Sequence, residues 1–429
     1  MREDLLHYIW KYSKLPKEHL VTTKNEAISL IDMGLHNHLA GPDFSNARIR
    51  IGGQLWAGNV EIHLKSSDWF AHHHETDSNY NNVILHVVWE DDMSVFREDR
   101  SEIPTLELKN YIPKHLLHAY HKLFDKRNFN FINCEKDIGT VDGFLLNNWL
   151  ERLFFERLES KSNLILDLLE KSKNDWERVL FILLSRNFGS KVNGDSFFDM
   201  ARGLNFSIIR KSYGNIVQLE SLLFGTAGLL EDDAVMDGYY INLKKEYGFL
   251  KNKFNIKTTR VLPPQFYGLR PSNFPTIRLS QLANLYAGRQ NLFSQLMDAD
   301  SVSRIYDVLR VSASDYWNDH YTFGKVSKKR NKGLGTRFID LIIINTIAPL
   351  KFCYARQRGK EVDGLILEII SGLKKEENRV VDNFKHHGAP IENAMQSQAI
   401  LQLYNEYCTE NRCLQCAVGA SLLGDKSRQ

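Results

Sequence analysis

Residues 41–65, which read GPDFSNARIRIGGQLWAGNVEIHLK, decide the fold of the first part of the chain. Apolar and polar residues alternate on both sides of a Gly-Gly pair, a pattern typical of two strands joined by a hairpin turn. Side chains on a strand point alternately to opposite faces, so Glu61, His63 and Lys65 share one face of the second strand. Asp43 enters the first strand, and the hairpin can return it to the neighbourhood of Glu61. The stretch therefore predicts two carboxylates beside an imidazole and an amine.

Strand and helix patterns continue on both sides of this hairpin. Residues 82–90 form a nearly continuous apolar run, which favours a strand that is buried on both faces. Residues 1–130 are therefore expected to form an α/β domain with a mixed sheet. Further along, apolar residues recur with the helical period, so residues 131–429 are expected to form a mostly α-helical domain. The remaining elements expected in the first domain are a strand at 103–108 and helices at 3–12 and 113–125.

The composition is that of a globular protein. Hydrophobic residues make up 43% and charged residues 25% of the 429 residues, which argues against a disordered chain. The 55 basic and 52 acidic residues leave a net charge of +3, so any affinity for nucleic acid must come from local patches. Five dispersed cysteines do not describe a secreted disulfide scaffold. The N-terminal residues carry acids where a signal peptide needs an apolar run, and no unbroken transmembrane run follows, so we expect a cytoplasmic protein without a membrane partner.

The hairpin resembles the core of the PD-(D/E)XK nuclease superfamily. That core is an α-β-β-β-α-β unit in which Pro-Asp opens one strand and Glu-X-Lys lies on the next. Here the Pro-Asp at 42–43 and the Glu-Ile-His at 61–63 match in order and spacing. The departure is His63 in the lysine position, with Lys65 one same-face step further on. The resemblance covers about residues 1–125.

This resemblance implies cleavage of phosphodiester bonds that depends on Mg²⁺ or Mn²⁺. It implies Asp43 and Glu61 as metal ligands, and His63 or Lys65 as the group that serves the attacking water. Carboxylate oxygens are the ligands that both ions prefer. Alternating polar residues are equally typical of a solvated sheet face, which is the alternative without a site.

Further polar residues follow the second strand. We expect Asp68 and His72 to tune the site, since active sites concentrate titratable groups. The spacing matches no standard metal motif, and a His/Asp metallohydrolase with a non-nucleic substrate is a further alternative. His86 lies within an apolar strand and is expected to be a hydrogen-bonded core histidine. The ligands of the His/Asp alternative would be His63, Asp68, His72, His74 and Asp77.

Three thiols lie close together near the C-terminus, at Cys408, Cys413 and Cys416. Thiols at such spacing in a cytoplasmic protein usually bind a metal. We expect Cys134 to be the fourth ligand, with a histidine at 386–387 as the alternative. A Zn²⁺ ion in this site would have a structural role, and an iron–sulfur cluster is the alternative for the same spacing.

A basic loop near residue 330 contains glycines but no Walker-type ending, and the chain has no serine-nucleophile elbow or dinucleotide fingerprint. Such a loop can follow a nucleic-acid backbone without reading its sequence, although a charge run is also typical of a solvated loop. The cations of this loop that we expect to bind nucleic acid are Lys325, Lys328, Lys329, Arg330, Lys332 and Arg337.

The whole chain also resembles a bacterial family known only as a domain of unknown function. The residues that carry this likeness lie at 6–10, 41–44, 66–69, 273–275 and in the final cysteine trio. Our leading expectation is a metal-dependent phosphodiesterase acting on DNA or RNA. The runner-up is a non-catalytic scaffold that binds nucleic acid or a ribonucleoprotein, in which a nuclease-like core has lost its lysine.

Overall fold

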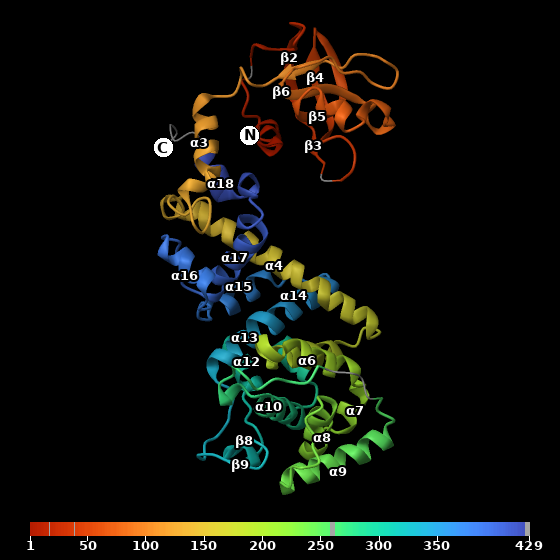
Figure 1. Ribbon diagram of the computed structural model, residues 1–429, viewed down its shortest axis with the longest axis vertical. Coiled ribbons are helices and arrows are strands. Elements are labelled where there is room, and N and C mark those ends of the chain that lie inside the picture. The colour runs from red at the N-terminus through yellow and green to blue at the C-terminus, as the bar shows by residue number, and fades with distance from the viewer. Residues whose placement is uncertain (17, 38, 258–261, 425–429) are drawn as a thin grey trace. The chain divides into compact units, whose positions relative to one another are not determined.

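The computed structural model describes the whole chain except residues 17, 38, 258–261 and 425–429 (Figure 1). The chain divides into two compact units. Unit 1 contains Met1–Leu146 and Asn405–Gln429, and unit 2 contains Asn147–Tyr404. The boundary that the sequence suggests, after residue 130, differs from this division. The described C-terminal residues belong to unit 1 because helix α18 (Ala417–Leu423) packs against helix α3 (Lys114–Phe124).

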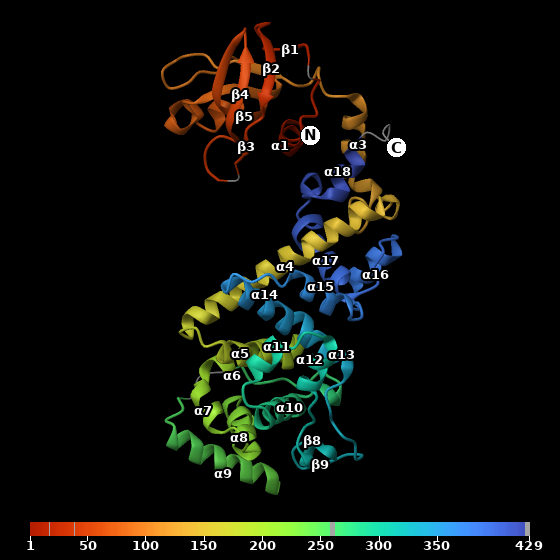
Figure 2. The same cartoon turned by 180° about the vertical axis from the view of Figure 1, so that it is seen from behind.

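Unit 1 is built on a seven-stranded mixed sheet, as the sequence predicts. The order is β1-β2-β4-β5-β6-β7, with β3 paired to β4. Neighbours from β1 to β5 are antiparallel, and β1, β2, β4 and β5 are labelled in Figure 2. Strands β5, β6 and β7 are parallel. The strands are β1 (Leu20–Val21), β2 (Ala27–Asp32), β3 (Leu35–His36), β4 (Phe44–Ile51), β5 (Gln54–Lys65), β6 (Val83–Glu90) and β7 (Thr105–Glu107).

Burial along the strands explains why this sequence forms the sheet. In β4 the apolar residues alternate with polar ones, and Phe44, Ala47, Ile49 and Ile51 are buried. Strand β6 is buried along most of its length, as its continuous apolar run predicts. A parallel step from β5 to β6 requires a crossover, which α2 (Asp68–Ala71) and two short 3-10 turns provide. Helix α1 (Glu3–Lys11) packs against β5.

Unit 2 is mostly helical, again as predicted. Its two short strands, β8 (His320–Thr322) and β9 (Lys325–Val326), form a separate hairpin. The helices that lie wholly or mostly in this unit are α4 (Gly143–Lys171), α5 (Trp176–Phe188), α6 (Ser190–Gly203), α7 (Phe206–Lys211), α8 (Ile216–Thr226), α9 (Gly238–Lys253), α10 (Pro275–Gly288), α11 (Leu292–Asp298), α12 (Val302–Leu309), α13 (Thr336–Ile342), α14 (Ala348–Gln357), α15 (Asp363–Ser371), α16 (Arg379–His386) and α17 (Ala394–Gln402).

One helical run in unit 2, Thr336–Gln357, is long and apolar enough to cross a membrane by length and composition. Its mean hydropathy is 1.5, and 78% of its most apolar window is buried inside the protein. The core helix of a water-soluble protein has these same properties. The run includes Asn345 and Pro349, so a search for unbroken apolar residues passes over it.

The close packing of β5 against β6 at Gly58 can be tested by substitution. A Cβ added at Gly58 would lie 2.4 Å from Ile84 Cγ2 and 2.6 Å from the backbone oxygen of Asn82. We therefore expect Gly58→Ala to lower the free energy of unfolding by about 1–3 kcal/mol, because the strand backbone must shift. Urea unfolding measures this difference. The matched control is Gly143→Ala, where an added Cβ meets open space; equal stability of the two variants would contradict the packing.

Candidate metal centre

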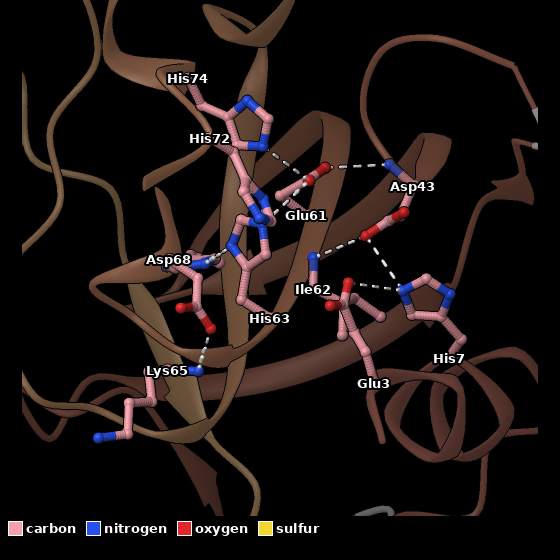
Figure 3. A network of polar contacts seen from close by, with 11 residues as sticks. Glu3, His7, Asp43, Glu61, Ile62, His63, Lys65, Asp68, His72 and His74 are labelled. Carbon is pink, nitrogen blue, oxygen red and sulfur yellow. Dashed lines mark hydrogen bonds and ion pairs between the residues drawn. The ribbon is translucent and has the colours of Figure 1, made fainter. Parts of the chain in front are cut away.

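Asp43 and Glu61 lie side by side, and each carboxylate accepts a hydrogen bond from a backbone N–H of the segment that carries the other (Figure 3). The pairing of β4 with β5 places Phe44 opposite Val60, and so brings Asp43 to Glu61. The Asp43 N–H donates to Glu61 Oε2 at 3.1 Å, and the Ile62 N–H donates to Asp43 Oδ2 at 3.0 Å. The predicted return of Asp43 to Glu61 is confirmed.

Helix α1 adds two ligand-type side chains that the sequence analysis missed. Glu3 and His7 are four residues apart and therefore share one helix face. His7 Nε2 lies 3.2 Å from Asp43 Oδ2 and 3.5 Å from Glu3 Oε1. The donor atoms of Glu3, His7 and Asp43 all lie within 4.8 Å of one another. Their signal was present in the expected helix at 3–12, but nothing in that pattern says which strand the helix packs on.

A second group of donor atoms lies on the other side of Glu61. The nitrogens of His63, His72 and His74 also lie within 4.8 Å of one another. Glu61 Oε1 is 3.4 Å from His74 Nε2 and 3.6 Å from His63 Nε2. One carboxylate therefore faces the histidine group with Oε1 and Asp43 with Oε2.

Buried aromatic residues hold the histidine rings in place. His63 Nδ1 lies 2.9 Å from Nε2 of His86, which is fully buried in β6, and His63 Nε2 lies 3.1 Å from His72 Nδ1. Tyr80 stacks on His74 with 3.8 Å between ring centroids, and the buried Trp69 contacts both His74 and His86. The expectation of a hydrogen-bonded core histidine at position 86 is confirmed.

Lys65 and Asp68 belong to the turn that follows β5 and do not face the carboxylates. The Lys65 N–H donates to Asp68 Oδ2 at 2.9 Å, and the exposed Lys65 side chain points away from the carboxylates (Figure 3). Asp77 likewise accepts a hydrogen bond from the Asn79 N–H. The alternative of a solvated sheet face is wrong as well, since Glu61 is 5% and His63 1% exposed. Of the six expected catalytic residues, the structure brings together Asp43, Glu61, His63 and His72.

The pKa values of His7 and His63, one from each group, are shifted in opposite directions. Burial lowers the pKa of His7, but the carboxylates of Asp43 and Glu3 outweigh it and raise that pKa to about 9. Burial lowers the pKa of His63 to about 4, and burial raises the pKa of Glu61. At neutral pH His7 therefore carries a proton among carboxylates, whereas His63 is neutral. A positive charge already occupies the place where a cation would be held.

The basic loop in unit 2 is divided between structural and exposed cations. Lys332 is buried, its ammonium donates to the carbonyl oxygens of Trp317 and His320, and it lies 3.9 Å from the Tyr321 ring centroid. Its expected contact with nucleic acid is therefore wrong, because the group is already satisfied within the fold. Arg337 pairs with Glu377. Besides Arg337, the exposed cations of the loop are Lys325, Lys328, Lys329 and Arg330.

Comparison with known proteins gives a family but no activity. A family model described as "Protein of unknown function (DUF2851)" matches residues 3–379. No curated protein and no solved structure matches the chain.

The opposite shifts of His7 and His63 predict how the stability of the metal-free protein depends on pH. His7 is raised from 6.5 to about 9, so its stabilising charge is present below pH 6.5 and is lost as the pH rises through 9. His63 is lowered from 6.5 to about 4, so stability falls as the pH drops from 6.5 towards 4. We expect a stability maximum near pH 6.5, with an alkaline loss on the order of 3 kcal/mol.

Urea unfolding in the presence of a chelator, across this range of pH, measures the loss of stability at alkaline pH (the alkaline limb) and at acid pH (the acid limb). In His7→Gln the alkaline limb should disappear while the acid limb stays. An alkaline limb of unchanged size in His7→Gln would contradict the assignment.

Proposed function

The chain belongs to the family described as "Protein of unknown function (DUF2851)", and from this premise we propose that unit 1 is a metal-dependent hydrolase that cleaves the phosphodiester bonds of nucleic acid. The observation that carries the proposal is the position of Glu61 between two sets of three ligand atoms. One set comes from Glu3, His7 and Asp43, and the other from His63, His72 and His74.

The residues present fit a divalent ion. Three carboxylates offer the oxygen ligands of Mg²⁺ or Mn²⁺, and the imidazoles favour Mn²⁺ or another transition metal. The donor atoms of Glu3, His7 and Asp43 lie within 4.8 Å of one another, and a bound ion would take the place of the proton that His7 holds beside the two carboxylates. A bound ion would polarise a phosphate oxygen and lower the pKa of a coordinated water.

The order of elements supports a phosphodiester as the substrate. When the two-residue strands β1 and β3 are left aside, helix α1, strands β2, β4 and β5, the helical crossover and β6 have the same order as the α-β-β-β-α-β core of the PD-(D/E)XK nucleases. The Pro-Asp at 42–43 precedes β4, and the Glu-Ile-His at 61–63 lies on β5. His63 occupies the position of the lysine in that pattern.

Other residues of the chain orient the carboxylates and accept the proton of the attacking water. The Ile62 N–H orients Asp43, and the Asp43 N–H orients Glu61. His72 is exposed and lies 3.1 Å from the neutral, buried His63. When the ion is held by the carboxylates of Glu3, Asp43 and Glu61, an imidazole in this position is left free of the metal and can accept the proton of an attacking water. We assign that role to His72.

A non-catalytic binding protein is the second candidate, and the direction of Lys65 favours it. The side chain of Lys65 is exposed and points away from Asp43 and Glu61, so this lysine does not serve the attacking water (Figure 3). Such a protein would bind nucleic acid through the exposed cations of the basic loop and leave it intact. The His/Asp metallohydrolase loses two of its ligands, because Asp68 and Asp77 serve local turns. In each case we propose a cytoplasmic protein.

Replacing Glu61 tests the enzymatic proposal. We expect wild type to cleave DNA or RNA with Mn²⁺ or Mg²⁺, and Glu61→Gln to lose at least about a hundredfold in rate, because outer-shell partners alone are worth up to that much. Lys65→Met is the matched control and should keep the wild-type rate. Single- and double-stranded substrates are assayed, with circular dichroism as the check of folding. Wild type that cleaves none of them with either ion would refute the enzyme and favour the binding protein.

The basic loop is tested by the salt dependence of binding. The triple variant Lys328→Ala, Lys329→Ala, Arg330→Ala should lower the slope of log K against log salt by about 0.7–0.9 for each phosphate contact removed. Lys245→Ala, an exposed lysine on α9, is the control. An unchanged slope in the triple variant would remove this loop from the binding surface.

A further inference from the structure

Four of the five cysteines lie in unit 1, at the ends of short elements. Cys134 lies in the turns that follow α3, where its carbonyl accepts from the N–H groups of Asp137 and Ile138. Cys408 ends a π-helical turn, Cys413 begins a 3-10 turn, and Cys416 directly precedes α18. All five cysteines are free thiols.

The four thiols converge although Cys134 is far from the other three in sequence. Asn133, the neighbour of Cys134, donates through Nδ2 to Cys413 Sγ at 3.4 Å. Burial raises the pKa of the Cys134 thiol, and the nearby Cys416 and Cys413 raise it further. The pKa of Cys408 is raised by burial and by all three other thiols. Each thiol therefore lies within electrostatic range of others in the group.

The backbone around Cys413 is tightly fixed. A Cβ added at Gly419 would lie 2.0 Å from the Cys413 carbonyl oxygen, so only glycine allows α18 to approach this closely. The Cys416 N–H donates to that same oxygen at 3.2 Å, and the Ala420 N–H donates to Cys416 O at 2.8 Å. Cys413 and Cys416 are thus presented by a short segment with little freedom to rearrange.

We propose that Cys134, Cys408, Cys413 and Cys416 bind an iron–sulfur cluster through four thiolates. Thiolate sets of this kind bind either zinc or iron–sulfur clusters, and the spacing separates the two. A tetrahedral zinc ion with Zn–S bonds of about 2.3 Å requires sulfurs about 3.8 Å apart. Among the described residues, the groups with three donor atoms within 4.8 Å are the two beside Glu61, and neither includes a cysteine. Since no three of the four sulfurs meet that limit, we assign the set to a cluster, in which each cysteine binds a different iron.

The cluster would act as a structural link, independent of the proposed hydrolysis. Helix α1 contacts the 3-10 turn that begins at Cys413, and Tyr8 Oη donates to Ala420 O at 3.4 Å. The same helix presents Glu3 and His7 to the carboxylates. A bound cluster would hold the C-terminal segment, the turns at 132–138 and α1 in one arrangement, and its binding would release the thiol protons.

The test is the metal content of the full-length chain, purified without oxygen and reconstituted with iron and sulfide. We expect iron, acid-labile sulfide and a visible thiolate-to-iron absorption band in wild type, all lost in Cys413→Ser and in Cys134→Ser. Cys353→Ser, a buried thiol of α14 in unit 2, is the matched control and should keep them. Asn133→Ala should keep the iron but shift the band, because the variant removes a hydrogen bond to a ligating sulfur.

Wild type alone decides the matter if the serine variants do not fold. Wild-type protein with one zinc and no iron after reconstitution would overturn the cluster, and wild type with neither metal would overturn the site. Metal analysis reads this result without any cleavage assay, so it does not depend on whether the protein is a hydrolase.

Discussion

The site depends on the two hydrogen bonds by which backbone N–H groups hold the carboxylates of Asp43 and Glu61 together. Two carboxylates that lie side by side repel each other, and burial of one of them adds to the cost. Each is compensated by a backbone N–H from the other strand, supplied by Asp43 and Ile62. Because backbone groups make these bonds, the strand register alone fixes the pair. The histidines and helix α1 are then arranged around a pair of acids that is already in place.

The sequence predicts this pair because its pattern is local. A period of two residues along β5 and one hairpin turn are enough to bring Asp43 to Glu61. Glu3 and His7 were missed because the packing of α1 on β5 is a tertiary fact that no local pattern carries. The predictions for Lys65 and Lys332 were wrong for a different reason. A charged side chain was expected to face a ligand. Lys65 instead ends β5 with its side chain pointing away from the carboxylates, and Lys332 is satisfied by carbonyl oxygens inside the loop.

The histidines around Glu61 behave as two different chemical populations. His63 and His86 are buried, and burial favours the uncharged imidazole by lowering the pKa of both side chains. His7 lies among carboxylates, where the imidazolium is favoured. Residues of one type thus acquire opposite charge states over a short span of the fold, which is a common property of sites that move protons.

Unit 1 is discontinuous in sequence, and this has a consequence for how the protein is made. Domains generally fold in the order in which the ribosome releases them, from the N-terminus onward. Here the sheet emerges early, but α18 and its partners on α3 are separated by the whole of unit 2. Until translation passes residue 423, the nascent chain exposes the surface of α3 that α18 covers. Unit 2 can therefore fold before unit 1 is complete.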